Sequence, residues 1–175
     1  DLAWSRGLGD VYKRQVRVIN KRGQCLATGH FQHGTIAVRI LSFEETQIDA
    51  TFFETKISNA LRLRENMGLV RENNSIYRLI HGEGDGLPGL IIDHYAGVYI
   101  VQCHSIGMYL AIEEISNALV NCAGKDLKAI YLKSKDTLPE RLEVENRYLH
   151  GTCETPHIAL ENGIRYSIDW VKGQK

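Results

Sequence analysis

The stretch His81–Tyr95, HGEGDGLPGLIIDHY, decides how the middle of this chain folds. Glycines alternate with two acidic residues, and Leu87-Pro88-Gly89 then leads into an apolar run. Glycine adopts left-handed backbone conformations at little steric cost, and proline fixes the φ angle of a turn. The apolar run that follows has the length and composition of a buried strand. We therefore predict a tight turn that leads into a strand.

Two chemical interpretations of the same stretch compete with the turn. A nucleotide phosphate loop needs its glycines between a strand and a helix, but here a strand follows and no G-K-[ST] is present. His81, Glu83 and Asp85 would share one face of an extended chain and could bind a metal. The intervening glycines do not hold such a chain rigid, and no second histidine stands at a ligand spacing. Glu83 and Asp85 as an acid–base pair lack an apolar pocket in the sequence, so the structural interpretation is the better supported one and no metal is expected.

Composition limits the class of protein. The chain has 175 residues, enough for one ordinary domain or two small ones, and 21 basic against 21 acidic residues. This balance gives no global signal for a nucleic-acid or membrane partner, although a local basic patch can still bind RNA. No apolar run approaches the ~20 residues of a membrane span. The cysteines, Cys25, Cys103, Cys122 and Cys153, are scattered without a C-x-x-C pair, which favours reduced thiols in a cytoplasmic protein.

The first fifteen residues differ from the rest. Ser5–Gln15, SRGLGDVYKRQ, has no apolar periodicity and matches a frame translation of a transposon-derived sequencing adapter over eleven consecutive residues. We interpret Asp1–Gln15 as an adapter-derived scar that forms no element. On this interpretation the chain is a fragment whose natural N-terminus is missing.

Residues 16–72 are predicted to form short strands followed by a helix. Val16–Val18 and Thr35–Phe43 read as strands, with a turn at Lys21–Gly23 between them. In the predicted helix, residues 49–69, Thr51 and Glu54 have the spacing of a capping box, and Gly68 stands where a C-terminal cap belongs. The predicted buried face of this helix contains Phe53, Ile57, Ala60, Leu61 and Arg64.

Residues 73–175 are predicted to form a second, small α+β domain of the type β-β-α-β-β, after a boundary loop at Asn73–Ser75. Apolar runs at 75–80, 89–95, 98–104 and 129–134 read as strands, with a tight turn at Ala96-Gly97. Ser105 is expected to cap a helix. Residues 157–170 read as a hairpin around Asn162-Gly163. The helix buries one face, made of Met108, Ala111, Ile112, Ile115 and Leu119.

Several runs together resemble one protein family. EGDGLPGLIIDHYAGVYIVQ, residues 83–102, is similar to the central-domain signature of the ribosomal RNA large-subunit methyltransferase I family. Residues 16–49 resemble the later strands of that family's PUA-like barrel, and residues 52–67 resemble the helix that follows it. IYLKS and ALENGIRYSIDWVKGQK resemble the end of its central domain. The resemblance extends over residues 16–175.

This resemblance implies a fold and a function. The fold would be a partial PUA-like β-barrel with a trailing helix (16–72), followed by the central α+β domain (73–175). The family uses S-adenosylmethionine (SAM) to make 5-methylcytosine in ribosomal RNA, through a Rossmann-like domain that follows a G-Q-K run and carries the nucleophilic cysteine. This chain stops at Gly173-Gln174-Lys175, with neither a glycine-rich SAM loop nor a Pro-Cys motif. We therefore expect no catalytic residue and no cofactor binding in this chain alone, although Gln174 and Lys175 would lie near the active site of the parent protein.

The implied partner is ribosomal RNA, held through phosphates and shape rather than a base code. No membrane partner is expected, and the parent protein could form a homodimer. Each basic residue could instead be a solvated surface charge, and Arg64 could cap a carbonyl at the helix end. Tyr95 and Tyr99 could stack on bases, but core packing is favoured. The candidate RNA contacts are Arg17, Lys21, Arg22, Arg39, Lys56, Arg62 and Arg64.

Two functions remain from the sequence. The chain is either the RNA-binding, substrate-positioning part of a SAM-dependent ribosomal RNA methyltransferase, or a stand-alone RNA-binding or protein-interaction module without catalysis. The adapter-like start and the end at GQK favour the first function.

Overall fold

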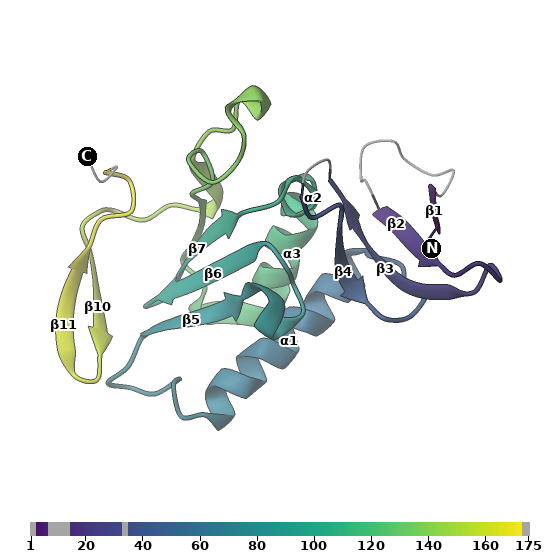
Figure 1. The fold of residues 1–175 in the computed structure, drawn as a ribbon. Helices are drawn as coiled ribbons and strands as arrows, with labels where there is room; N and C mark the ends of the chain where they lie inside the picture. Colours follow the sequence, from purple (N-terminus) through teal and green to yellow (C-terminus); the bar gives the residue numbers. More distant parts are fainter. Residues whose placement is uncertain (1–2, 7–14, 33–34, 173–175) are drawn as a thin grey trace.

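A computed structural model describes residues 3–6, 15–32 and 35–172 of the chain. Figure 1 shows a four-stranded N-terminal sheet at one side of the molecule, a five-stranded sheet with its helices in the middle, and a two-stranded hairpin at the other side. The prediction of an α+β fold is confirmed. Within the described residues, no helix has the length and apolar character needed to cross a membrane.

The N-terminal sheet is antiparallel and open, in the order β1-β2-β3-β4. It contains a strand at Ala3–Arg6, so the prediction that residues 1–15 form no element is wrong there; residues 7–14 lie outside the described part. Ala3–Arg6 joins the sheet through backbone pairing with β2, and this pairing does not require apolar periodicity in the sequence of the strand. The described residues form no closed barrel. The strands are β1 (Ala3–Arg6), β2 (Gln15–Ile19), β3 (Cys25–Phe31) and β4 (Val38–Ser42).

The central sheet has the order β5-β6-β7-β8-β9, and only the β7–β8 pairing is parallel. Three strands precede α2 and α3, in agreement with the apolar runs at 75–80, 89–95 and 98–104, so the domain type β-β-α-β-β is one strand too short on that side. The last strand was also missed, because the sequence RYLHG carries no clear alternation of apolar and polar residues. The strands are β5 (Ile76–His81), β6 (Leu90–Tyr95), β7 (Val98–Cys103), β8 (Ala129–Leu132) and β9 (Arg147–Gly151).

The helices are α1 (Ala50–Asn66), α2 (Ile106–Leu110) and α3 (Ile112–Ala123). The predicted capping box is wrong: Asp49 caps α1 by accepting from the backbone N–H of Phe52 at 3.0 Å, which places Thr51 inside the first turn. Gly68 follows α1 with φ of 69°, as predicted for a C-terminal cap. Ser105 caps α2 as predicted, but Ala111 divides the expected single helix into two.

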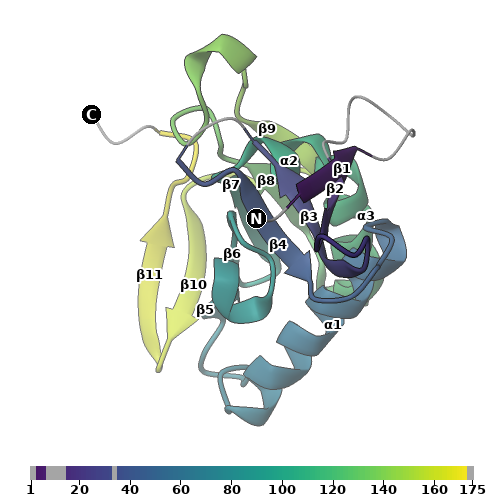
Figure 2. The same cartoon turned by 45° about the vertical axis from the view of Figure 1, so that its right-hand side comes forward.

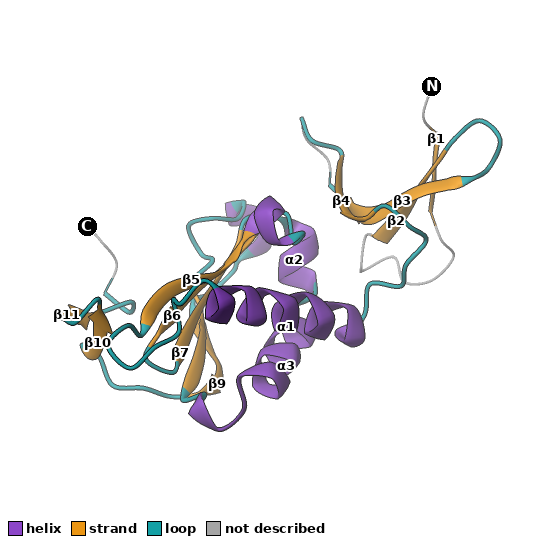
Figure 3. Ribbon diagram, turned by 90° about the horizontal axis from the view of Figure 1, so that it is seen from below, coloured by secondary structure: helices purple, strands orange, loops and turns teal. Residues whose placement is uncertain are grey.

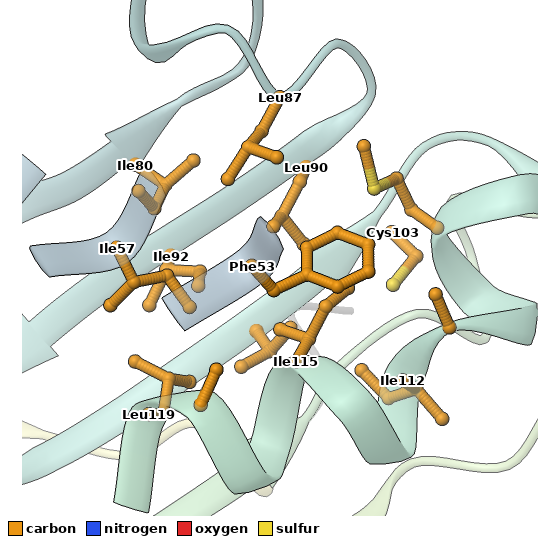
Figure 4. Packing of buried hydrophobic residues seen from close by; sticks show 14 of the residues in the cluster. Phe53, Ile57, Ile80, Leu87, Leu90, Ile92, Cys103, Ile112, Ile115 and Leu119 are labelled. Carbon is orange, nitrogen blue, oxygen red and sulfur yellow. The ribbon is translucent and has the colours of Figure 1, made fainter. Parts of the chain in front are cut away.

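One core lies between the helices and the central sheet. α1 and α3 pack side by side on the same face of that sheet (Figure 3). Phe53 and Ile57 of α1 meet Ile115 and Leu119 of α3 over Leu90 and Ile92, and all are buried (Figure 4). The helix that the sequence analysis grouped with the N-terminal strands therefore contributes its apolar face to the core of the central sheet.

Hydrogen bonds to Asn73 and Asn74 hold the turn of the C-terminal hairpin, and we call this set of bonds the hairpin latch. The hairpin consists of β10 (His157–Glu161) and β11 (Ile164–Ile168), joined at Asn162-Gly163 as predicted. The side-chain oxygen of Asn74 accepts from the backbone N–H of Asn162 at 3.1 Å, and the backbone N–H of Gly163 donates to the carbonyl of Asn73 at 2.8 Å. After the hairpin, Trp170 packs on the sheet face opposite the helices, together with Val98, Ile100, Ala129 and Tyr131.

The N-terminal sheet docks onto the central part through β3 and the segment after it. His30 is buried against Gly107 of α2, where an added Cβ would lie 2.4 Å from the His30 ring. The side chain of Gln32 accepts from the backbone N–H of Ile106 at 3.1 Å. Figure 2 brings this N-terminal sheet to the front, with β4 beside the turn between β5 and β6.

Candidate functional site

The His81–Tyr95 stretch forms the turn that the sequence predicted. A short 3-10 helix, η1 (Gly82–Asp85), follows β5 and leads into β6. Gly82, Gly86 and Gly89 have φ of 53°, 69° and 83°, a region that other residues rarely adopt. At Gly89 an added Cβ would also lie 2.8 Å from the Ser105 hydroxyl, so the glycine permits close approach of the turn to α2.

A buried ion pair fixes the turn to α1. One carboxylate oxygen of Asp85 lies 2.7 Å from the Arg64 guanidinium and accepts from the backbone N–H of His81 at 2.6 Å. The two side chains are 10% and 6% exposed, and Arg64 also donates to the carbonyl of Arg78 in β5 at 3.0 Å. Arg64 therefore joins helix, strand and turn. Only 10% of its side chain is exposed, so an RNA contact of Arg64 stays a prediction, and the carbonyl that it meets belongs to a strand rather than to its own helix end.

A groove of about 570 Å³ runs between β4 and this turn. Its β4 side is largely apolar and includes Phe43, whose exposed fraction is 80%. The facing side is formed by Glu83, Gly86 and Pro88 of the turn and by Lys56 of α1. The remaining lining residues are Ile36, Val38, Arg39, Ile40, Leu41, Ser42 and Glu44.

A smaller cavity of about 200 Å³ adjoins the groove, and Arg39 and Glu83 line both. His81, at the end of β5, and His104, directly after β7, supply two imidazoles. Two strand ends and β4 thus converge on one pocket that carries three nitrogen-donor side chains and one carboxylate. Gly82, Gly89, Leu90 and Ile91 complete its lining.

Apart from Arg64, the predicted RNA contacts separate into three groups. Arg39 and Lys56 line the groove, and the Lys56 ammonium lies 5.4 Å from the centre of the Phe52 ring. Arg17 is half-exposed and paired with Glu45 at 2.5 Å. Gln174 and Lys175, the predicted active-site neighbours, lie outside the described residues. The third group is exposed and does not line the groove; it contains Lys21, Arg22 and Arg62.

Phe43, His81 and His104 were not among the predicted RNA contacts. Nothing in the run ILSFEE distinguishes an exposed phenylalanine from a buried one. A signal did exist for the histidines, because His81 directly follows one predicted strand and His104 ends another, and antiparallel pairing through β6 brings the end of β5 and the end of β7 to the same edge. Tyr99 is buried, in agreement with core packing, and Tyr95 is half-buried.

The cysteines divide into a buried thiol and three half-buried ones. Burial raises the pKa of Cys103 to about 12, as expected of an inert core thiol. Cys122 lies near the end of α3 and is half-buried. The sulfur of Cys153 lies 3.4 Å from Nδ1 of His157. Among the described residues, no group of three or more His, Cys, Asp or Glu could hold a metal ion.

Curated relatives of the chain include proteins named as ribosomal RNA methyltransferases. The chain is 32% identical over 183 aligned positions to "Ribosomal RNA large subunit methyltransferase I" of Vibrio cholerae, and 33% identical to the protein of the same name from Vibrio parahaemolyticus. Each match covers 98% of this chain and 45% of the relative, so the chain spans just under half the length of these relatives. No protein-family model matches the chain.

The fold is similar to that of solved structures. A protein described as "a putative SAM-dependent methyltransferase" from Streptococcus mutans superposes with a TM-score of 0.73 at 21% identity. The match covers 88% of this chain and 39% of that protein. The arrangement of sheets and helices described above therefore occurs within a larger protein.

Proposed function

We propose that this chain is the RNA-binding and substrate-positioning part of a SAM-dependent ribosomal RNA (cytosine-5)-methyltransferase. The observation that carries this proposal is the similarity of 98% of the chain to relatives named for ribosomal RNA methylation. The chain resembles less than half of each relative, so we assign SAM binding and the methyl-transfer chemistry to residues of the parent protein outside this chain. On this proposal the 175 residues alone are inactive.

The groove between β4 and the turn suits the positioning role. Two basic side chains, Arg39 and Lys56, face a channel whose wall carries an exposed aromatic ring. Proteins that hold single-stranded nucleic acid combine such cations with aromatic platforms for the bases. We propose that Arg39 and Lys56 contact RNA phosphates, and that Arg17, Lys21, Arg22 and Arg62 contribute a weaker, solvent-screened attraction.

Several finer assignments belong to the same proposal. We assign residues 16–72 to a PUA-like RNA-binding domain and residues 73–175 to the central domain of the family. We place the protein in the cytoplasm, with ribosomal RNA as its partner. We also propose that the parent protein forms a homodimer. The adapter origin of Asp1–Gln15 remains a prediction, and reading the same locus from an independent library would check it.

The test has two arms. Binding of labelled large-subunit ribosomal RNA fragments to the chain is measured by fluorescence anisotropy, and methyl transfer is measured with radiolabelled SAM. We expect RNA binding without methyl transfer, while the full-length Vibrio cholerae relative serves as the positive control for transfer. Absence of RNA binding at low salt would contradict the proposal. It would favour a protein-interaction module, for which the exposed Ile36 and Phe43 beside the edge strand β4 provide a surface.

A further inference from the structure

We propose that the smaller cavity is a phosphodiester subsite, in which Arg39, His81 and His104 hold one phosphate of a single RNA strand while a neighbouring base stacks on Phe43. This inference rests on the proposed function, because it names the place and the chemistry by which the chain grips RNA. It requires three donors in one pocket and an accessible ring beside it, and both are present.

Arg39 is the cation at the centre of the subsite. Its cross-strand partner in the sheet is His30, so both side chains leave the sheet on the same face, the face that meets α2 at Gly107. The Arg39 side chain is half-buried and lines both cavities, yet it makes no hydrogen bond or ion pair with any described residue. A partly desolvated guanidinium without a partner favours an anion, and its fork of N–H donors matches two phosphate oxygens.

The two histidines can donate to the same anion. The guanidinium of Arg78 lies 3.4 Å from Nδ1 of His81, and because arginine only donates, Nδ1 accepts and the ring proton stands on Nε2. His104 has no side-chain partner among the described residues, and its backbone N–H donates to the carbonyl of Gly89 at 2.8 Å, which holds it beside the turn. Both imidazoles line the cavity, and each keeps a ring N–H for which the described residues offer no partner.

Glu83 sets the kind of phosphate that fits. Its carboxylate lines both cavities and has no partner among the described residues. A nearby negative charge penalises a dianionic terminal phosphate more than the single charge of a phosphodiester. The same carboxylate can accept from a ribose hydroxyl, the group that distinguishes RNA from DNA. The pocket thus suits an internal linkage of an RNA strand.

Phe43 supplies the second contact. It lies four residues beyond Arg39 along the β4 direction, which corresponds to roughly 13 Å at the rise of an extended strand. Its ring is 80% exposed, although it lies in a groove lined by apolar side chains. A ring in this position offers one face to a base, and stacking of this kind tolerates any base. A peptide strand paired with the β4 edge could also cover Phe43, but it would leave the cationic pocket unused.

The test combines two probes. Imidazole resonances of His81 and His104 are followed by NMR during titration with a uridine dinucleotide and, separately, with inorganic phosphate. Affinity for a labelled oligouridylate is measured by anisotropy across a salt series. We expect both histidines to shift with the dinucleotide and less with phosphate. Arg39→Ala should lower the slope of log affinity against log salt by about 0.7, the value for one phosphate contact to a single strand.

Matched variants separate the contacts. Phe43→Ala should weaken oligouridylate binding about 10-fold, within the range for one stacked base. The double variant His81→Gln/His104→Gln should also weaken it, and Glu83→Gln should strengthen inorganic phosphate binding. Arg165→Ala is the control, because it removes an exposed arginine from the hairpin at the opposite side of the molecule (Figure 1).

Two results would overturn the inference in distinguishable ways. If the unaltered chain binds RNA but Arg39→Ala and the double histidine variant bind as tightly as Arg165→Ala, the subsite is wrong and the proposed function stands. If the unaltered chain binds no oligouridylate or ribosomal RNA fragment and neither histidine shifts, both proposals fail together.

Discussion

The Asp85 carboxylate is 6% exposed, and the contacts around it account for its charge. Arg64 neutralises it and a backbone N–H donates to it, so an ionised group is tolerated inside the fold. The helical spacing of α1 predicted that Arg64 lies on the buried face. It could not predict the partner, because the contact joins residues 21 positions apart that meet only through packing.

Removing one member of this pair should be costly. Asp85→Asn leaves the Arg64 charge buried without a counter-charge, and we expect the free energy of unfolding to fall by roughly 3–5 kcal/mol. Urea titration followed by circular dichroism measures the loss. The exposed pair Arg17–Glu45 is the control, and Glu45→Gln should cost at most about 1 kcal/mol. Equal costs for the two variants would show that burial of the Arg64–Asp85 pair is unimportant.

Two histidines, the buried His30 and the half-buried His94, make stability depend on pH. Burial lowers the pKa of His30 to about 4, and burial, followed by smaller effects that include repulsion from Lys128, lowers that of His94 to about 4. Both values lie below the ordinary 6.5, so the unfolded chain binds protons more tightly. The stabilising contribution is complete above about pH 6.5 and is lost as the pH falls toward 4, up to roughly 3 kcal/mol for each histidine.

Unfolding free energies measured by urea titration across this pH range test that prediction. His30→Gln and His94→Gln should each flatten the dependence, whereas His150→Gln, at an exposed position, should leave it unchanged. A protein as stable at pH 4.5 as at pH 7 would contradict the argument.

At the scale of elements, sequence signals with a short range were reliable. Ser105 caps α2, and the turns at Ala96-Gly97 and Asn162-Gly163 form hairpins, because each depends on the residues next to it. Asp49 was overlooked as a cap because Thr51 and Glu54 offered the more familiar pattern. β9 depends on pairing with β8, which its own residues do not reveal.

The hairpin latch gives a prediction at this scale. Asn74 is 5% exposed, and its amide donates to the carbonyl of Leu69 at 2.6 Å while its oxygen accepts from the backbone of Asn162. Asn74→Ala should destabilise the fold by about 1–3 kcal/mol, because buried polar groups lose their partners. Hydrogen exchange should become faster across β10 and β11. Asn73→Ala, which removes an exposed side chain and keeps the backbone bond, should not change it; equal exchange in both variants would exclude the latch.

At the scale of the whole molecule, the groove lies between two parts of the chain, the N-terminal sheet and the central sheet with its helices. β4 comes from the N-terminal sheet, and the opposite wall is the turn that Arg64 fixes to α1. The sequence suggested both parts, through a resemblance to known proteins and through local patterns. It did not show how they face each other, because that depends on the packing of His30 on Gly107 and on the bond from Ile106 to Gln32.

Gly107→Ala tests this docking. The new methyl group would lie 2.4 Å from the buried His30 ring, so we expect the N-terminal sheet to separate from α2 while the central core stays folded. Small-angle X-ray scattering should show a larger radius of gyration, and RNA affinity should fall because the groove opens. Gly84→Ala is the control, since its methyl group would meet only a ring atom of His81 at 3.9 Å. An unchanged radius of gyration in Gly107→Ala would show that the contact does not set the arrangement.

One wall of the groove belongs to the N-terminal sheet and the other to the central part of the chain. A ligand that fills the groove therefore stabilises their docked arrangement. A ligand that needs both walls binds only the docked arrangement, so its binding free energy adds to the contacts at His30 and Gln32. At a ligand concentration one hundred times its dissociation constant, this linkage favours the docked form by about 2.7 kcal/mol. RNA held in the groove would thereby act as a clamp on the relative orientation of the two parts, and the nucleic acid would help to set the geometry in which it is presented.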